Sequence, residues 1–131
     1  MKRSPRTPMV FLLFLLAAAL AAAGTTYPLK LKDQFGREVT IPREPKRIVS
    51  CSPGGTETLF ALGLDERIVG VTNWCNYPEK AKDKPKIGDI TPLNVEKVVA
   101  LAPDLVVAHE LNGKEAVERL AGLGLPVLAL R

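Results

Sequence analysis

An α/β fold is predicted by this sequence: a parallel four-stranded sheet with flanking helices, preceded by a β-hairpin. Four short apolar runs mark the sheet strands, and they are Ile48-Val49, Arg67–Val71, Leu105–Ala108 and Pro126–Leu130. None of them alternates apolar with polar residues, which is typical of parallel strands covered on both faces. Helical patterns separate several of the runs, as in βαβ crossovers. Residues 47–131 are therefore predicted to form a Rossmann-like lobe.

The stretch Arg47–Gly63 shows how one such unit is built. After the first strand, Ser52 is suited to cap a helix, and Pro53 suits the first turn, where a missing N–H costs nothing. The helix is expected to end at Gly63, with an apolar stripe made of Leu59, Phe60 and Leu62. The turn Ser52–Thr56 then lies at the carboxyl edge of the sheet, where open α/β sheets bind ligands.

Residues 1–23 have the features of a secretory signal peptide. A basic segment comes first, with Lys2, Arg3 and Arg6, followed by the apolar run Val10–Leu20 and the small residues Ala21–Ala23. A membrane anchor is the alternative, but the apolar run is shorter than the roughly 20 residues of a span. We expect cleavage near residue 23, a mature chain beginning near Gly24 in the periplasm or another extracytoplasmic space, and no lipid anchor, since no Cys lies near the cleavage site.

The charge of the chain comes largely from this first segment. The whole sequence has 18 basic and 14 acidic residues and a net charge of +4. Without residues 1–23 the balance is 15 basic against 14 acidic, a net charge of +1. The excess of basic residues is therefore no evidence for a nucleic-acid partner, and none is expected. The mature length of about 108 residues suits one small domain.

Residues 24–46 are predicted to form the β-hairpin and a linker. Leu29–Lys32 and Glu38–Ile41 alternate with a period of two around the Gly-containing loop Asp33–Gly36.

Two further helices are predicted after the second sheet strand. Asn94 is expected to cap a helix that runs to about Leu101, with Val95, Val98, Val99 and Ala102 facing inward. Asn112 and Glu115 are in capping-box register for a helix to about Leu123, with Val117, Leu120 and Ala121 inward. Two i,i+4 ion pairs are expected on it, Glu115 with Arg119 and Lys114 with Glu118.

In the order of its short motifs, the chain resembles the periplasmic binding proteins that deliver cobalamin and iron-siderophores to ABC importers. The matching pieces are the hairpin Asp33–Ile41, Pro45–Ser50, Ser52-Pro53, Thr56-Glu57, Phe60–Gly63, Val69–Val71, Asn76–Pro78, Pro85-Lys86, Gly88, Leu93–Glu96, Ala100-Leu101, Pro103–Leu105, Leu123-Gly124 and Pro126-Val127. The match covers everything after the signal peptide, and its specificity lies in the ordered set and not in any single piece.

The resemblance implies two α/β lobes joined by a long helix, with the ligand in the cleft between them. This sequence stops at about the end of the first lobe, so the second lobe is absent from it. The resemblance also implies that Glu96, in its Leu-Asn-Val-Glu setting, pairs with arginines of the membrane-spanning importer subunit. The helix dipole alone would also favour a carboxylate in that first turn.

Six residues are the candidate ligand contacts. Ser52, Pro53 and Gly54 follow the first sheet strand, and their small side chains would let a bulky ligand approach the backbone, although an ordinary helix cap explains them equally well. Trp74 and Tyr77 lie in a loop after the second strand, where aromatic faces suit a flat macrocycle. By resemblance, Trp74 occupies the position where cobalamin-binding relatives place an aromatic; the alternatives are packing on a neighbouring helix and, for Tyr77, anchoring of its own loop.

His109 follows the third strand and also faces the cleft edge. Ile90 stands where cobalamin binders can carry another aromatic, which weakens cobalamin relative to other chelates. A lone His is more often structural than a metal ligand, and a zinc or manganese site would need several converging His or carboxylate ligands. No metal site is therefore predicted, and no cofactor is expected beyond a ligand that is itself a metal chelate.

Cys51 and Cys75 are the only cysteines and form a candidate disulfide, because exported proteins with paired cysteines often bridge them. They are not a CxxC pair, and the sequence has no GxSxG, Walker or GxGxxG motif, so an enzyme is not predicted. The expected function is substrate binding for an ABC importer of cobalamin or ferric siderophores, with heme as a further ligand, by a monomer. The alternative is an exported α/β interaction or remnant domain with no transport activity of its own.

Overall fold

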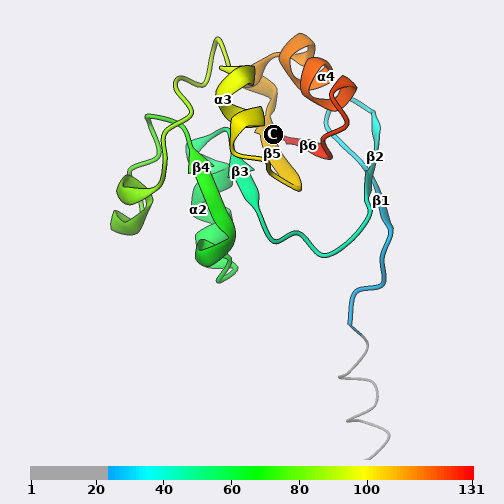
Figure 1. Cartoon of the computed structure of the whole chain (residues 1–131), viewed down its shortest axis with the longest axis horizontal. Helices are drawn as coiled ribbons and strands as arrows, with labels where there is room; N and C mark the ends of the chain where they lie inside the picture. The colour runs from blue at the N-terminus through cyan, green and yellow to red at the C-terminus, as the bar shows by residue number, and fades with distance from the viewer. Residues whose placement is uncertain (1–23) are drawn as a thin grey trace, which may run out of the picture.

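The computed structural model describes residues 24–131 and shows a parallel sheet with helices on both faces and a hairpin at one side (Figure 1). The sheet strands are β3 (Ile48–Ser50), β4 (Ile68–Val71), β5 (Leu105–His109) and β6 (Val127–Leu130). Their order in the sheet is β4-β3-β5-β6, and all three pairings are parallel. The predicted four-stranded parallel sheet is thus confirmed.

The helices divide between the two faces of this sheet. They are α2 (Pro53–Ala61), α3 (Val95–Ala100) and α4 (Lys114–Gly122), with short 3-10 helices η1 (Asp65–Arg67), η2 (Glu79–Asp83) and η3 (Glu110–Asn112). Leu59 of α2 packs in one core with Ile48 and Ile68, whereas Val98 of α3 and Leu120 of α4 pack in a second core with Val49. The strands are therefore apolar on both faces, as their unbroken apolar runs require.

Local capping explains where the first two helices begin. The Ser52 hydroxyl accepts a hydrogen bond from the Gly55 N–H at 3.1 Å, and Pro53 is the first residue of α2, as predicted. Gly63, just past the end of α2, has a φ of +73°, which favours glycine and ends the helix. Asn94 caps α3 by accepting from the Lys97 N–H at 3.0 Å. These caps are short-range, so the sequence alone was enough to predict them.

The hairpin consists of β1 (Leu29–Lys32) and β2 (Glu38–Ile41), with the predicted bounds. Its loop reaches β6, the outer strand of the sheet: the Gln34 N–H donates to the Ala129 carbonyl at 3.0 Å, and the Arg37 guanidinium donates to the Val127 carbonyl at 2.8 Å. These contacts cover a strand edge that would otherwise be open to other chains.

Several expected details are wrong. Val99 is 40% exposed, because the buried face of the short helix α3 consists of Val95 and Val98. Ala102 is also exposed, because α3 ends at Ala100 and the helical periodicity does not extend past it. Leu62 is 67% exposed because it is the C-cap of α2 rather than part of its buried stripe. The N-cap of α4 is Gly113, without a side-chain hydrogen bond, so the predicted capping box at Asn112 is not formed.

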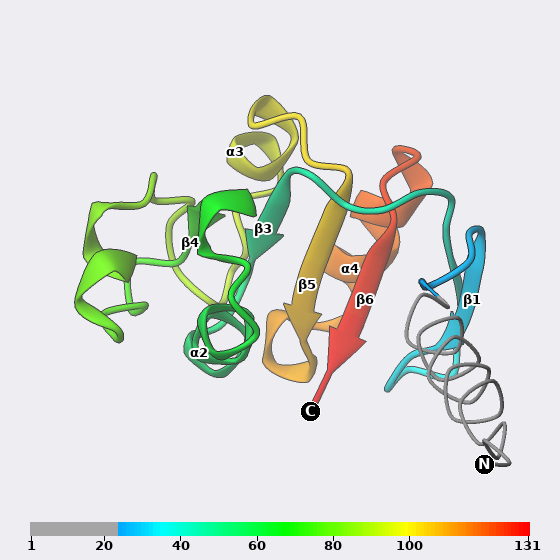
Figure 2. The same ribbon diagram turned by 90° about the horizontal axis from the view of Figure 1, so that it is seen from below.

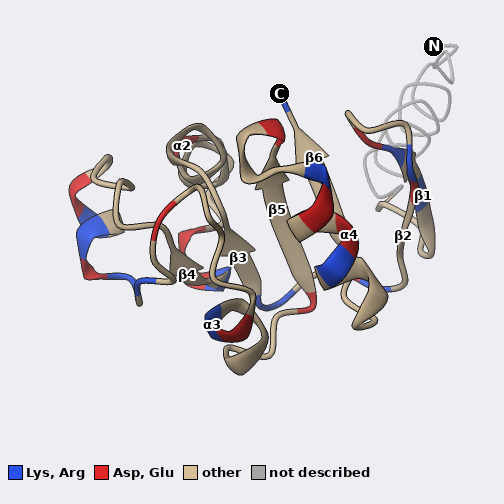
Figure 3. Ribbon diagram, turned by 90° about the horizontal axis from the view of Figure 1, so that it is seen from above, with Lys and Arg blue, Asp and Glu red and all other residues tan. Residues whose placement is uncertain are grey.

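One of the two ion pairs expected on α4 is also wrong. Lys114 and Glu118 are 3.4 Å apart, as predicted. Arg119, however, pairs with Glu96 of α3 at 2.9 Å and not with Glu115, because α3 and α4 lie against each other on the same face of the sheet. Acidic and basic positions on both helices can be followed in Figure 3.

Within residues 24–131, no helix has the length and apolar character needed to cross a membrane. The predicted signal peptide, its cleavage near residue 23 and the absence of a lipid-anchor Cys concern a segment outside the described residues.

Candidate functional site

The carboxyl ends of β3, β5 and β6 lie at the same edge of the sheet, because the three strands are parallel (Figure 2). A cavity of about 270 Å³ lies at this edge. It is lined by Ser52, Pro53, Gly54, Gly55, Thr58, Ile90, His109, Leu111, Leu130 and Arg131. These residues come from α2 and its cap, from the last residues of β5 and β6, and from the segments after the strands, so the topology of the sheet assembles them. We call this the strand-end cavity.

A second cavity, of about 290 Å³, lies between the hairpin and the α4–β6 connection. We place the candidate site at the strand-end cavity, for two reasons. Open α/β sheets bind ligands at the carboxyl ends of their strands. In addition, large exposed apolar side chains lie at or after the ends of β4, β5 and β6, and they are Trp74, Tyr77, Leu111 and Leu130.

Four of the six predicted ligand residues meet in the strand-end cavity: Ser52, Pro53, Gly54 and His109. The structure does not bring Trp74 and Tyr77 into it. Both lie on the loop after β4 and are 62% and 67% exposed. Sequence reasoning missed Leu111, Leu130 and Arg131, although each stands at or just after the end of a strand, which is the signal that could have found them.

Ser52 and the glycines after it shape the floor of the cavity. A Cβ on Gly55 would lie 3.0 Å from the Ser52 Oγ and 3.1 Å from the Ser50 Oγ, so a side chain there would disturb the cap. A Cβ on Gly54 would meet nothing within 4 Å. A side chain at Gly55 would therefore require the two hydroxyl groups to shift by a few tenths of an ångström, while Gly54 leaves open space at the wall of the cavity.

Asn112 holds two walls of the cavity together, a role that the sequence did not reveal. Its Nδ2 donates to the carbonyls of Cys51 at 3.0 Å and Ile90 at 2.9 Å. Its Oδ1 accepts from the His109 N–H at 2.7 Å, and the side chain is buried, with 3% exposed. The Asn112 amide therefore connects three segments that are far apart in the sequence. These hydrogen bonds fix the positions of Ile90 and His109 in the cavity.

The loop after β4 presents its two aromatic side chains to solvent. The Trp74 indole N–H donates to the Asp89 carboxylate at 3.2 Å, which orients the ring without burying it. The alternative expectation, that Trp74 packs against a neighbouring helix, does not fit a side chain that is 62% exposed. An exposed, oriented indole is suited to stack on a flat ligand.

Cys51 and Cys75 are buried free thiols, so the candidate disulfide is not present. Cys51 packs in the core with α3 and α4, whereas Cys75 packs in the core with α2. The two side chains therefore lie on opposite faces of the sheet. Burial, with a smaller contribution from Cys75, raises the pKa of the Cys51 thiol to about 12. Cys51 therefore stays protonated at neutral pH and is a poor nucleophile or metal ligand.

Within the part of the chain that the structure describes, no three His, Cys, Asp or Glu side chains are grouped so as to hold a metal ion. His109 is the sequence's only histidine, and its nearest acidic neighbour in sequence, Glu110, pairs with Arg131 at 3.3 Å.

Glu96 lies on α3, outside the strand-end cavity, and is exposed. Its carboxylate meets the Arg119 guanidinium at 2.9 Å, and the two side chains are 74% and 62% exposed. An exposed pair of this kind contributes at most about 1 kcal/mol to stability, so the fold does not depend on it.

Comparison with known proteins identifies the family. Residues 48–131 match the family described as "Periplasmic binding protein". The chain belongs to the periplasmic binding protein family. The resemblance stated from its motifs is thereby confirmed, and the parallel sheet with flanking helices and a hairpin is the fold of its structural neighbours.

Named relatives of this periplasmic binding protein include substrate-binding proteins. It is 43% identical over 107 residues to an uncharacterized ABC transporter substrate-binding lipoprotein, YvrC, of Bacillus subtilis, a match that covers 79% of this chain and 34% of that protein. It is 34% identical over 87 residues to a vitamin B12-binding protein of Pectobacterium carotovorum, covering 66% and 32% of the two chains. A solved periplasmic heme binding protein from Pseudomonas aeruginosa aligns with a TM-score of 0.63 and 33% identity, over 66% of this chain and 32% of its own. The chain spans about a third of the length of the curated relatives it matches.

Proposed function

We propose that this chain supplies the first lobe of the extracytoplasmic substrate-binding component of an ABC importer for cobalamin, a ferric siderophore or heme. The observation that carries the proposal is the strand-end cavity, and Trp74 and Tyr77 add two exposed aromatic side chains on the loop after β4. The family membership and the relatives named for vitamin B12 and heme support the class of ligand. The relatives are binding proteins, and the proposed role includes no catalytic step and no resident cofactor, since the ligand is itself the chelate.

The size of the cavity explains why one lobe is expected to bind weakly. Ligand sites enclose about 300–1,000 Å³ and bury 70–90% or more of a ligand. The strand-end cavity holds about 270 Å³ and is open on one side, so it supplies one wall of such a site. A second lobe would supply the other wall.

Intrinsic fluorescence offers a direct test, because Trp74 is the only Trp in the sequence. Saturable quenching by cyanocobalamin, a ferric hydroxamate siderophore or hemin is expected, and it should be far tighter in a two-lobed protein than in this lobe alone. If none of these three chelates binds to the two-lobed protein, the proposal fails and an interaction domain without transport activity is favoured.

Trp74→Ala should weaken binding of the chelate by about 1–3 kcal/mol, because the ligand would lose an aromatic contact and its buried area. Isothermal titration calorimetry is the measurement, since the variant lacks the fluorescent reporter. Phe60→Ala is not a suitable control, because Phe60 packs against the core. Leu62→Ala is suitable, because Leu62 is exposed at the C-cap of α2 and does not line the cavity. Equal affinities of wild type and Trp74→Ala would exclude Trp74 as a ligand contact.

We also propose that Glu96 docks the protein on its importer through arginines of the membrane-spanning subunit. The carboxylate is exposed, and its present partner Arg119 is exposed too, so the pair can open at little cost. An arginine of the importer would then replace Arg119, and its planar guanidinium could bind the Glu96 carboxylate through two N–H groups at once.

Glu96→Ala should leave ligand affinity and thermal stability nearly unchanged but weaken importer docking by about 2–5 kcal/mol if the new pair is buried, and less at a rim. Docking would be measured with the importer in nanodiscs. Glu118→Ala is the matched control, because it removes another exposed carboxylate, paired to Lys114 at 3.4 Å, from the adjacent helix. A loss of stability with normal docking would leave Glu96 only its favourable interaction with the helix dipole.

A further inference from the structure

The hydrogen bond made by the His109 ring restricts what this side chain can do in the strand-end cavity. Its Nδ1 lies 3.1 Å from the backbone nitrogen of Leu111. A backbone N–H can only donate, so Nδ1 must accept, and the proton of the neutral ring must then be on Nε2. In the neutral ring Nε2 is therefore a donor, and it makes no hydrogen bond to another of the residues 24–131.

This arrangement is the reverse of what a metal-binding histidine needs. A histidine that ligates a metal through one nitrogen donates the N–H of the other to a carboxylate, carbonyl or water. For His109 Nε2 to offer a lone pair to a metal, the proton would have to move to Nδ1, where it would face the Leu111 N–H. Two donors would then oppose each other. The local fold thus favours hydrogen bonding by His109 and disfavours coordination.

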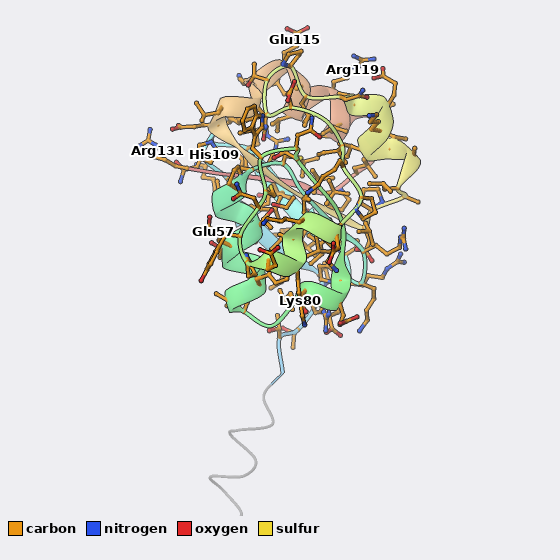
Figure 4. The ribbon with its side chains drawn as sticks, turned by 90° about the vertical axis from the view of Figure 1, so that its left-hand side faces the viewer. Glu57, Lys80, His109, Glu115, Arg119 and Arg131 are labelled. Atoms are coloured by element: carbon orange, nitrogen blue, oxygen red, sulfur yellow. The ribbon has the colours of Figure 1, made fainter. Side chains whose placement is uncertain are left out.

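A second donor lines the same cavity. Arg131 follows the end of β6, and the register pairs Leu130 with His109 on β5, so the two polar side chains belong to adjacent strand ends. Figure 4 shows the labelled His109 and Arg131 together at one side of the molecule. Arg131 contacts Glu110 through Nε alone, at 3.3 Å, which leaves the four N–H donors of its terminal nitrogens outside that pair.

The remainder of the cavity offers no competing negative charge. Its other walls are apolar or small, with Pro53, Ile90, Leu111 and Leu130 among them, and none of the described residues that line it is an Asp or a Glu. Glu110, which follows His109 in the sequence, is paired with Arg131. Two donors beside an apolar wall are complementary to a large apolar ligand that carries an acidic oxygen group.

We infer that the strand-end cavity takes a carboxylate-bearing macrocycle or chelate, whose carboxylate accepts hydrogen bonds from His109 Nε2–H and Arg131, and that His109 does not coordinate the ligand's metal. The inference rests on the proposed function and specifies the chemistry of its ligand. The binding affinity would then depend on the acidic groups of the ligand and would not depend on whether its metal is present.

Three related porphyrins separate these contributions without changing the protein. Hemin has both iron and carboxylates, protoporphyrin IX has the carboxylates without iron, and hemin dimethyl ester has iron without free carboxylates. We expect hemin and protoporphyrin IX to bind with similar affinity, and the ester to bind roughly tenfold or more weakly, because it loses charge-assisted hydrogen bonds. Quenching of Trp74 and calorimetry are the measurements.

Substitutions test the two residues. His109→Leu should weaken both acidic porphyrins by roughly tenfold, whereas His109→Gln, which keeps an N–H donor, should recover much of the loss. Arg131→Gln should weaken them similarly. Lys80→Gln is its matched control, since it removes one positive charge near Asp65 and outside the cavity, and it should have no effect.

The outcomes separate this inference from the proposed function. If His109→Leu weakens hemin but not protoporphyrin IX and shifts the Soret band of bound hemin, His109 is a metal ligand and the inference is wrong, while the importer role stands. The inference is also wrong if cyanocobalamin or hemin dimethyl ester binds tightly while neither hemin nor protoporphyrin IX binds. The proposed function would stand in that case. Only the failure of every chelate to bind would overturn the proposed function.

Discussion

Asn112→Ala is expected to destabilise the protein by about 3–5 kcal/mol, because one buried and two partly buried backbone groups lose their hydrogen-bond partner and each unsatisfied group costs about 1–3 kcal/mol. Those groups are the carbonyls of Cys51 and Ile90 and the N–H of His109. The same change releases two walls of the strand-end cavity, so ligand affinity should fall as well. Urea unfolding followed by circular dichroism measures the first effect, and ligand titration below the transition measures the second.

Asn94→Ala is the matched control for this change. Asn94 also accepts from a backbone N–H, that of Lys97 at 3.0 Å, but it caps a helix at the surface and joins no distant segments. Its loss should cost only about 1 kcal/mol and leave ligand binding intact. Equal effects of the two substitutions would contradict the role assigned to Asn112.

Asp33→Ala is expected to destabilise the protein by about 3–5 kcal/mol, the cost of removing one partner from a buried ion pair. The Asp33 carboxylate is fully buried and accepts from the Arg37 side chain at 2.6 and 3.0 Å and from the N–H groups of Phe35 and Arg37. Arg37 in turn binds the Val127 carbonyl of β6, so losing Asp33 also loosens the hairpin from the sheet. Glu38→Ala is the control, because its pair with Lys30, at 3.7 Å, is exposed and should contribute at most about 1 kcal/mol.

The same residue predicts a dependence of stability on pH. Burial by itself would raise the pKa of Asp33, but the hydrogen bonds and positive charge of Arg37 outweigh it, and the pKa of the folded protein lies below the usual value of 3.8. The contribution of Asp33 is therefore fully present above about pH 4 and is lost as the pH falls through its folded pKa. The stability difference between wild type and Asp33→Asn should be constant from about pH 5 to 8 and shrink below pH 4. A difference that instead grew on acidification would show that the carboxylate is not stabilised by Arg37.

Local interactions account for what could be predicted from the sequence. The four strands were recognised because parallel strands buried on both faces need unbroken apolar runs, and Ser52, Gly63 and Asn94 were recognised because caps act within one helical turn. The family was recognised because short motifs such as these occur in a fixed order, and the match to residues 48–131 confirms it. Ser52, Pro53, Gly54 and His109 were placed at one edge because parallel strands all end there.

Only the tertiary structure decided which distant groups meet. Asn112 was predicted to cap the next helix, but it bonds across 61 residues to Cys51, because the register of β3 and β5 brings the two strand ends together. Arg119 had a local partner available in Glu115 and pairs instead with Glu96, since α3 and α4 share one face of the sheet. Cys51 and Cys75 follow neighbouring strands but pack on opposite faces, a difference that depends on which way each side chain points. Hydrogen bonds, ion pairs and disulfide bridges between separate elements depend on the register of the strands and on the face toward which each side chain points. Both are set only when the elements pack, so these contacts cannot be predicted from residue spacing along the chain.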